Sequence, residues 1–164
     1  MKEHTKPNGN SDLKSFKQLL ESGEECLQER KFNQALSFFR RANELKPNEP
    51  EVLLDLAKAY LGLEKWSKVK NLGESYVKKH GHNTEIMQLL SKVYTFEGDY
   101  RKALLCLERA ARGTNDSKYI TLEREKIKQQ YHDDYKKKKI LVLCGEGADS
   151  FTDDIIKGLK EFFW

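Results

Sequence analysis

The sequence predicts an all-α fold in which pairs of antiparallel helices stack into a solenoid. Bulky residues recur every 34 positions, at Phe32, Trp66 and Tyr100, and a period of this length is typical of stacked helix pairs. Composition agrees, because 38% hydrophobic and 34% charged residues suit thin layers that contact only their neighbours better than a compact globule. Two further series keep the same spacing, and these are Ala35, Val69 and Ala103, and Ala42, Tyr76 and Ala110.

Composition and charge also narrow the function. The net charge of +4 is mild and does not indicate nucleic-acid binding. Cys26, Cys106 and Cys144 are widely spaced and form no zinc or disulfide pattern, which favours a reducing compartment. The N-terminus has no apolar signal-peptide core, and no stretch approaches the roughly 18 apolar residues of a membrane span. We therefore expect a cytoplasmic protein that neither enters a membrane nor binds nucleic acid.

The helical domain is expected at residues 12–135. Residues 1–11 are polar and offer no apolar side chain to bury, so we expect a disordered N-terminus. Ser11 or Asp12 can cap the first helix, because a short oxygen-bearing side chain accepts from an unpaired N–H of the first turn.

The first repeat is expected at residues 16–49. Gly23, Ala35 and Ala42 are small residues at positions where its two helices would cross. Backbones can approach closely only where no large side chain intervenes, so these residues predict tight packing. Pro47 then stops the second helix.

The second repeat, residues 50–83, departs from the first in its second helix. Gly73 takes the place of Phe39, and Tyr76 takes the place of Ala42. Relative to the first repeat, the large aromatic side chain is therefore displaced by about one turn along the same helix face. Gly73 also lowers helix propensity by about 1 kcal/mol relative to alanine. We expect this helix to pack at an altered angle and this repeat to be the least stable.

The third repeat, residues 84–117, is the most regular copy, with Ala103 and Ala110 at the small positions. A helix at residues 117–135 follows it. A solenoid needs a terminal helix with a polar outer face to cover its last layer, so we expect a capping helix here. The apolar residues of its inner stripe are Tyr119, Ile120, Leu122 and Ile127.

Residues 136–164 have a different character. After the basic run Lys136–Lys139, the apolar run Ile140–Cys144 predicts a strand, the glycine-rich Gly145–Ser150 a turn, and Phe151–Trp164 an amphipathic helix. A single strand cannot form a sheet, so we expect the chain to be the N-terminal piece of a longer protein with a Rossmann-like domain. The basic run is interpreted as a solvated linker, with contact to RNA or acidic lipid as the alternative.

The repeat pattern resembles the tetratricopeptide repeat (TPR) family, in which a bulky residue opens the first helix of each repeat and small residues recur where helices cross. This resemblance implies that a protein or peptide partner lies in a concave groove lined by the first helices. A purely structural spacer is the alternative. The mixed lining suits an amphipathic helix or an extended peptide. The expected groove residues are Lys17, Leu20, Glu24, Leu54, Lys58, Leu61, Gln88, Lys92, Thr95 and Phe96, and Leu27, Glu51 and Glu85 also fall at groove positions.

One sub-class of the family is excluded by charge. Chaperone-binding members hold a C-terminal carboxylate with basic and amide side chains at set groove positions. The matching positions carry Leu20, Glu24, Asp55, Glu85 and Leu89 in this sequence. Three are acidic and none is basic, so the groove would repel a carboxylate.

The last residues, 136–163, resemble the first βα unit of bacterial glycosyltransferases with two Rossmann-like domains, some of which carry N-terminal TPR arms. This resemblance implies an alternative function, in which the repeats position a protein or polysaccharide acceptor for an enzyme. A third interpretation is self-association through the apolar segment 140–164.

No catalytic set or cofactor site is expected. The turn Gly145–Gly147 could bring N–H groups toward a phosphate, but Asp149 and Asp153 disfavour an anion there. His80 and His82 lack further ligands nearby, so no metal site is expected.

Overall fold

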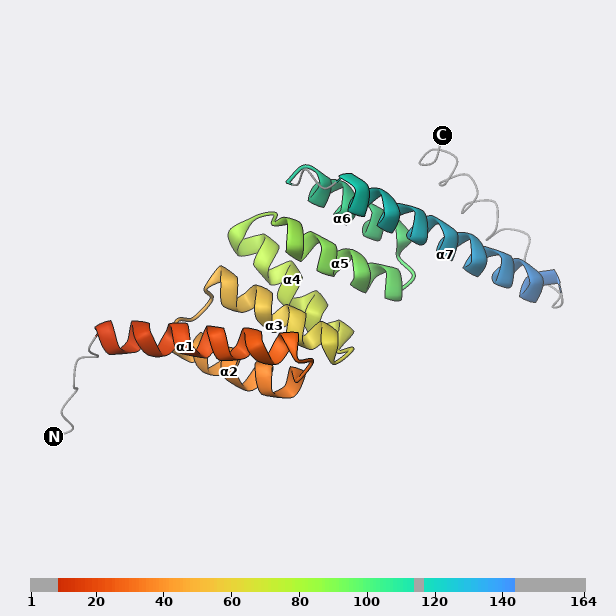
Figure 1. Ribbon diagram of the computed structural model, residues 1–164. Coiled ribbons are helices and arrows are strands. Elements are labelled where there is room, and N and C mark those ends of the chain that lie inside the picture. The colour runs from red at the N-terminus through yellow and green to blue at the C-terminus, as the bar shows by residue number, and fades with distance from the viewer. Residues whose placement is uncertain (1–8, 114–116, 144–164) are drawn as a thin grey trace. The chain divides into compact units, whose positions relative to one another are not determined.

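The computed structural model describes residues 9–113 and 117–143, and within them the chain forms α-helices and no strand (Figure 1). This confirms the predicted all-α solenoid. The helices are α1 (Gly9–Gln28), α2 (Phe32–Leu45), α3 (Pro50–Gly62), α4 (Trp66–His80), α5 (Thr84–Phe96), α6 (Tyr100–Ala111) and α7 (Ser117–Leu143).

The first six helices stack in pairs. Each helix contacts the next one along the chain, and α3 also contacts both α1 and α5. The helices α1, α3 and α5 therefore form one layer, and each is backed by the second helix of its own repeat. Contacts divide the chain into the units Met1–Arg124 and Glu125–Trp164, and the first unit contains this layer.

The turns inside the three repeats share an unusual backbone conformation. Arg30, Glu64 and Gly98 have φ values of 59°, 55° and 76°, and they lie at the same position of each repeat. Left-handed φ costs a residue with a side chain about 1–2 kcal/mol, whereas glycine adopts it readily. The third turn is also capped, since the Asp99 side chain accepts from the Lys102 N–H. The third turn therefore fits its sequence better than the first two.

Close approach of helices depends on the small residues of the pattern. Ala35 and Ala42 are fully buried beside Phe39, which is itself fully buried. A Cβ atom at Gly23 would lie 2.7 Å from Cζ and 2.9 Å from Cδ1 of the Phe39 ring. Real Cβ atoms essentially never come this close. The ring thus fills the space that the missing side chain leaves on α1.

The unusual second repeat has a packing explanation. Gly73 of α4 is buried, and a Cβ atom there would lie 2.7 Å from Cδ2 of Leu90 on α5. Tyr76, one turn later, is also buried. The glycine therefore admits a leucine of the next repeat. The lower stability expected for the second repeat stays a prediction.

The first helix begins earlier than the sequence predicted. Residues 9–11 were expected to be disordered, but α1 starts at Gly9. Ser11 and Asp12 therefore lie within α1, and the expectation that one of them caps this helix is wrong.

The prediction of a linker at 136–139 and a strand from Ile140 is wrong for the described residues. The helix α7 continues from Ser117 to Leu143, well past the expected end at residue 135. It contains no glycine or proline, and extending a formed helix costs far less than starting another element. A strand here would also have no described neighbour to pair with. Residues 144–164, which hold the expected turn and final helix, lie outside the described residues.

The start of α7 contacts α6 within the first unit, and the capping role expected for residues 117–135 stays a prediction. Ile120 is buried, and Arg124 approaches Glu108 of α6 at 4.0 Å. Farther along, the Lys128 ammonium lies 3.0 Å from Glu125, and the Gln129 amide donates to Asp133 at 3.0 Å. No helix among residues 9–113 and 117–143 is long and apolar enough to cross a membrane.

Candidate functional site

The expected groove residues lie on the three helices of one layer. Lys17, Leu20 and Glu24 come from α1, Leu54, Lys58 and Leu61 from α3, and Gln88, Lys92, Thr95 and Phe96 from α5. Because α3 contacts both α1 and α5, the layer is continuous. Its chemistry divides into a charged centre, a pocket beside α1 and an aromatic pair at the end of α5.

Lys58 is the centre of the charged part. Its ammonium lies 3.2 Å from Oδ1 of Asp55 and 2.8 Å from Oε2 of Glu85, so it joins α3 to α5. Burial lowers the pKa of Lys58, but the hydrogen bond and charge of Glu85 and the charge of Asp55 outweigh burial, and the net pKa is raised. Lys58 is therefore held as a cation by two carboxylates.

Asp55 is the most buried charged residue described in this layer, with a side chain 5% exposed. Its Oδ1 receives Lys58, whereas its Oδ2 is buried without a hydrogen-bond partner among the described residues. Burial raises the pKa of Asp55, Lys58 opposes the rise, and the charges of Glu24 and Glu51 add to it. The carboxyl group of Asp55 thus lies near both glutamates of the α1–α3 surface.

A pocket of about 270 Å³ brings three of the expected residues together beside α1. Phe16 and Leu20 are buried, and Lys46 places its ammonium 4.6 Å above the Phe16 ring. Glu51 comes from the first turn of α3. The pocket thus combines apolar and charged walls, and its complete lining is Leu13, Phe16, Lys17, Leu20, Glu21, Glu24, Lys46 and Glu51.

An aromatic pair joins the end of α5 to the start of α4, and one of its rings is exposed. Phe96 is 62% exposed and stacks on Trp66 of α4, with ring centroids 4.4 Å apart and planes 13° from parallel. Lys70 and Glu97 form an ion pair of 2.6 Å on the same two repeats. The sequence placed Phe96 in the groove but used Trp66 only as one of the residues that mark the 34-residue period. The aromatic residue at the start of α4 was the available signal.

The remaining expected residues are less distinctive. Leu54, Leu61 and Gln88 are half-buried, and Lys92 is exposed. The Thr95 hydroxyl donates to the Ser91 carbonyl at 2.8 Å, within its own helix. The structure therefore joins Lys17, Leu20 and Glu24 in one pocket, and the aromatic pair of Trp66 and Phe96 is a separate feature of the layer.

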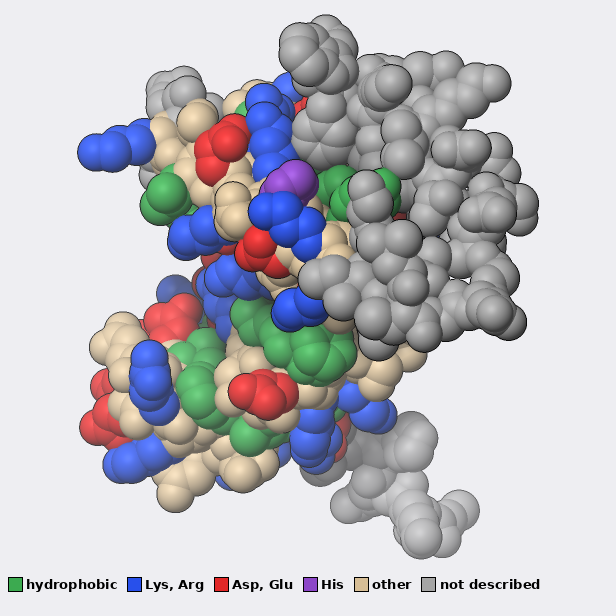
Figure 2. Space-filling view, turned by 90° about the vertical axis from the view of Figure 1, so that its right-hand side faces the viewer, with side chains coloured by type: hydrophobic (Ala, Val, Ile, Leu, Met, Phe, Trp, Pro, Cys, Tyr) green, Lys and Arg blue, Asp and Glu red, His purple; other side chains and the backbone are tan. Residues whose placement is uncertain are grey.

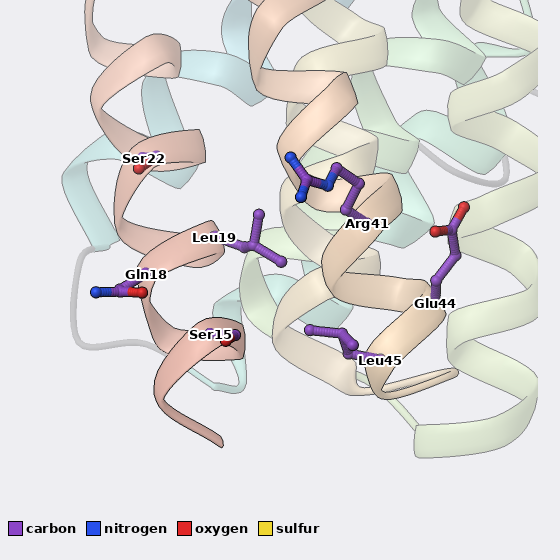
Figure 3. Close-up of a pocket in the computed structure, with 7 residues that line it drawn as sticks. All are labelled: Ser15, Gln18, Leu19, Ser22, Arg41, Glu44 and Leu45. Carbon is purple, nitrogen blue, oxygen red and sulfur yellow. The ribbon is translucent and has the colours of Figure 1, made fainter. Parts of the chain in front are cut away.

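Another pocket, of about 570 Å³, lies between α1 and α2 (Figure 3). Leu19 and Leu45 point toward one another from the two helices, while Gln18 points away. None of the expected groove residues lines this pocket. Its polar lining includes Ser15, Ser22, Arg41 and Glu44.

The surface carries both signs of charge. On the face in Figure 2, hydrophobic side chains gather in patches between basic and acidic ones. Among the described residues no group of three or more His, Cys, Asp or Glu could hold a metal ion. His80 lies beside the ring of Tyr76, with centroids 5.2 Å apart.

Comparison with known families identifies the repeats. Tetratricopeptide repeat models match residues 27–72 and residues 84–112, so these segments are similar to TPR repeats. Their combination with the helix stack supports a protein-interaction scaffold as the general class of function.

Forty solved chains match this structure. One is the crystal structure of the Sgt2 TPR domain from Aspergillus fumigatus, with 16% identity and a TM-score of 0.64 over 82% of this chain and 87% of that chain. At this identity the likeness shows the fold alone. A search of curated proteins found no match. None of these findings supports the resemblance of residues 136–163 to a glycosyltransferase.

Proposed function

We propose that this chain is a scaffold that binds a peptide or a helix of a partner protein along the layer α1–α3–α5. The observation that carries the proposal is Phe96, a large aromatic side chain left 62% exposed at an expected groove position. Its stacking on Trp66 holds the ring in place. A fixed, exposed aromatic surface is a common anchor for a partner, because it gives apolar contact at little entropic cost.

The surroundings of this anchor suit an amphipathic ligand. Leu54 and Leu61 of α3 are half-buried and retain apolar surface, and Lys92 adds an exposed charge on α5. An amphipathic helix could place apolar residues against the leucines and Phe96 and polar residues against the charged centre. The similarity to TPR repeats over residues 27–72 and 84–112 favours the same mode.

A peptide selection tests the groove directly. Random peptides displayed on phage are selected against the immobilised full chain, and synthetic copies are measured by fluorescence anisotropy. The variant Phe96→Ser with Lys92→Glu changes two exposed groove residues. Loss of an aromatic anchor typically costs about 1–2 kcal/mol or more, so affinity should fall at least about tenfold.

A matched control makes the same changes outside the layer. Leu105→Ser with Lys68→Glu alters exposed residues of α6 and α4 and should leave affinity within about twofold. Circular dichroism verifies that both variants stay folded. Equal binding by all three proteins, or a selection that yields no peptide, would refute the groove.

A further inference from the structure

The pocket between α1 and the start of α3 has an apolar floor and an acidic rim. Phe16 and Leu20 are 6% and 7% exposed and form the floor. Glu21, Glu24 and Glu51 are exposed on the rim. A pocket of about 270 Å³ with this division fits a long side chain that is apolar along its stem and charged at its tip.

The rim carboxylates are not neutralised by the residues around them. Among the residues that the structure describes, none forms an ion pair with Glu21, Glu24 or Glu51. The opposing charges in the pocket are Lys17 and Lys46, two against three. Lys46 instead lies over the Phe16 ring, which shows that this floor accepts a cation.

A buried carboxyl group, Asp55, lies near two of the rim glutamates. Its side chain is 5% exposed, and its Oδ2 has no hydrogen-bond partner among the described residues. The carboxyl is near enough to Glu24 and Glu51 for their charges to raise its pKa. Asp55 does not itself line the pocket, so it indicates the charge around the rim and is not a contact for the ligand.

We propose that this pocket receives a basic side chain, preferably arginine, from the partner segment that lies in the groove. This inference rests on the proposed function and names the charge of the partner. The arginine stem packs on Phe16 and Leu20, and its guanidinium lies between Glu24 and Glu51. A guanidinium has five donors in a plane and can serve two carboxylates at once, and it is more weakly hydrated than an ammonium.

The test compares three short probes on the full chain. They are capped tripeptides of leucine, X and leucine, in which X is arginine, lysine or citrulline. Citrulline has nearly the shape of arginine but no charge. Binding is followed by NMR shift changes of the backbone amides of residues 13–24 and 50–55. The arginine probe should bind about threefold to tenfold more tightly than the citrulline probe, since partly exposed ion pairs are worth about 0.2–1 kcal/mol each.

Two variants locate the effect. Glu24→Gln with Glu51→Gln keeps the shape of the rim, and should abolish the preference for arginine without changing the affinity of the citrulline probe. Glu25→Gln is the matched control, because Glu25 is an exposed residue of α1 that does not line the pocket. It should leave the preference intact. The lysine probe should bind between the other two.

The inference is overturned if arginine and citrulline probes bind equally, if no probe shifts the pocket amides, or if the double variant keeps the preference. Failure of this inference is distinguishable from failure of the proposed function. Peptides selected on the groove would still lose affinity with Phe96→Ser and Lys92→Glu if the groove binds a partner without an arginine in this pocket.

Discussion

The variant Gly23→Ala tests whether the close packing of α1 against Phe39 determines the stability of the first repeat. A methyl group at this site would lie 2.7 Å from Cζ and 2.9 Å from Cδ1 of Phe39, and closer still to Cε1. The Phe39 ring is fully buried and belongs to the core that includes Phe16, Leu20 and Leu36, so the ring has no free space to enter. Overpacking of a core typically costs about 1–3 kcal/mol.

Helix propensity acts in the opposite direction. Alanine is better than glycine inside a helix by about 1 kcal/mol, and Gly23 lies within α1. Because three ring carbons lie under 3.0 Å from the added atom, we place the cost of the clash at the upper end. The variant should therefore lose about 1–2 kcal/mol of unfolding free energy, and its Tm should fall by about 2–8 °C.

Urea unfolding followed by circular dichroism measures this loss. Ser22→Ala, at the adjacent half-buried position, is the control, and should be neutral or more stable by about 0.5 kcal/mol. Phe39→Leu makes room for the methyl group, so Gly23→Ala with Phe39→Leu should be more stable than the sum of the single effects by about 1 kcal/mol. A Gly23→Ala protein as stable as the wild type would show that propensity, not the ring, decides at this site.

Two further predictions concern Asp55 and the turn at Glu64. Burial raises the pKa of Asp55 above its ordinary value, so the folded protein holds the carboxyl proton of Asp55 more strongly than the unfolded chain does. The stability from this proton is present below the unfolded pKa of about 3.9 and is lost as pH rises through the raised folded pKa. The difference in unfolding free energy between Asp55→Asn and the wild type should therefore shift in favour of the variant as pH rises from acid to neutral. Urea midpoints measured across this pH range record the difference. A difference that stays constant with pH would contradict the raised pKa. Glu64→Gly should raise the free energy of unfolding by about 0.5–1 kcal/mol. The φ of 55° at Glu64 strains a residue with a side chain, and glycine relieves this strain at some entropic cost. Gly98→Ala, at the equivalent turn with φ of 76°, should lose about 1 kcal/mol of unfolding free energy in the same urea assay. A Glu64→Gly protein less stable than the wild type would show that the backbone at Glu64 is not strained.

The period of the sequence was enough to predict the stacked helices. Phe32, Trp66 and Tyr100 each begin the second helix of a repeat, because the first turn of that helix is where a bulky residue recurs. The small residues Ala35 and Ala42 are fully buried, as close packing of helices requires. Both features follow from local spacing, so no knowledge of tertiary contacts was needed.

The end of α7 shows where local patterns fail. Ile140–Leu143 has the apolar, partly β-branched composition of a strand, yet these residues extend a helix. A short apolar run does not separate strand from helix by its periodicity. What decided the outcome was the uninterrupted helix before it.

The sequence also did not show which of the groove residues lie close together in space. Lys17, Leu20 and Glu24 share a pocket with Glu51 from a different helix, and Phe96 stacks on Trp66 from the preceding repeat. These pairs depend on the distance and angle between layers, which the side chains at the crossing points set together.

The sequence by itself therefore determined the repeat, its helices and the acidic character of the clamp positions, because each depends on residue type and spacing along one segment. Only the tertiary structure decided that Asp55 is buried with one unpaired oxygen, that Lys58 joins Asp55 to Glu85, and that a leucine of α5 occupies the space at Gly73. Burial and cross-repeat contacts arise from the packing of layers, and no single repeat contains that information.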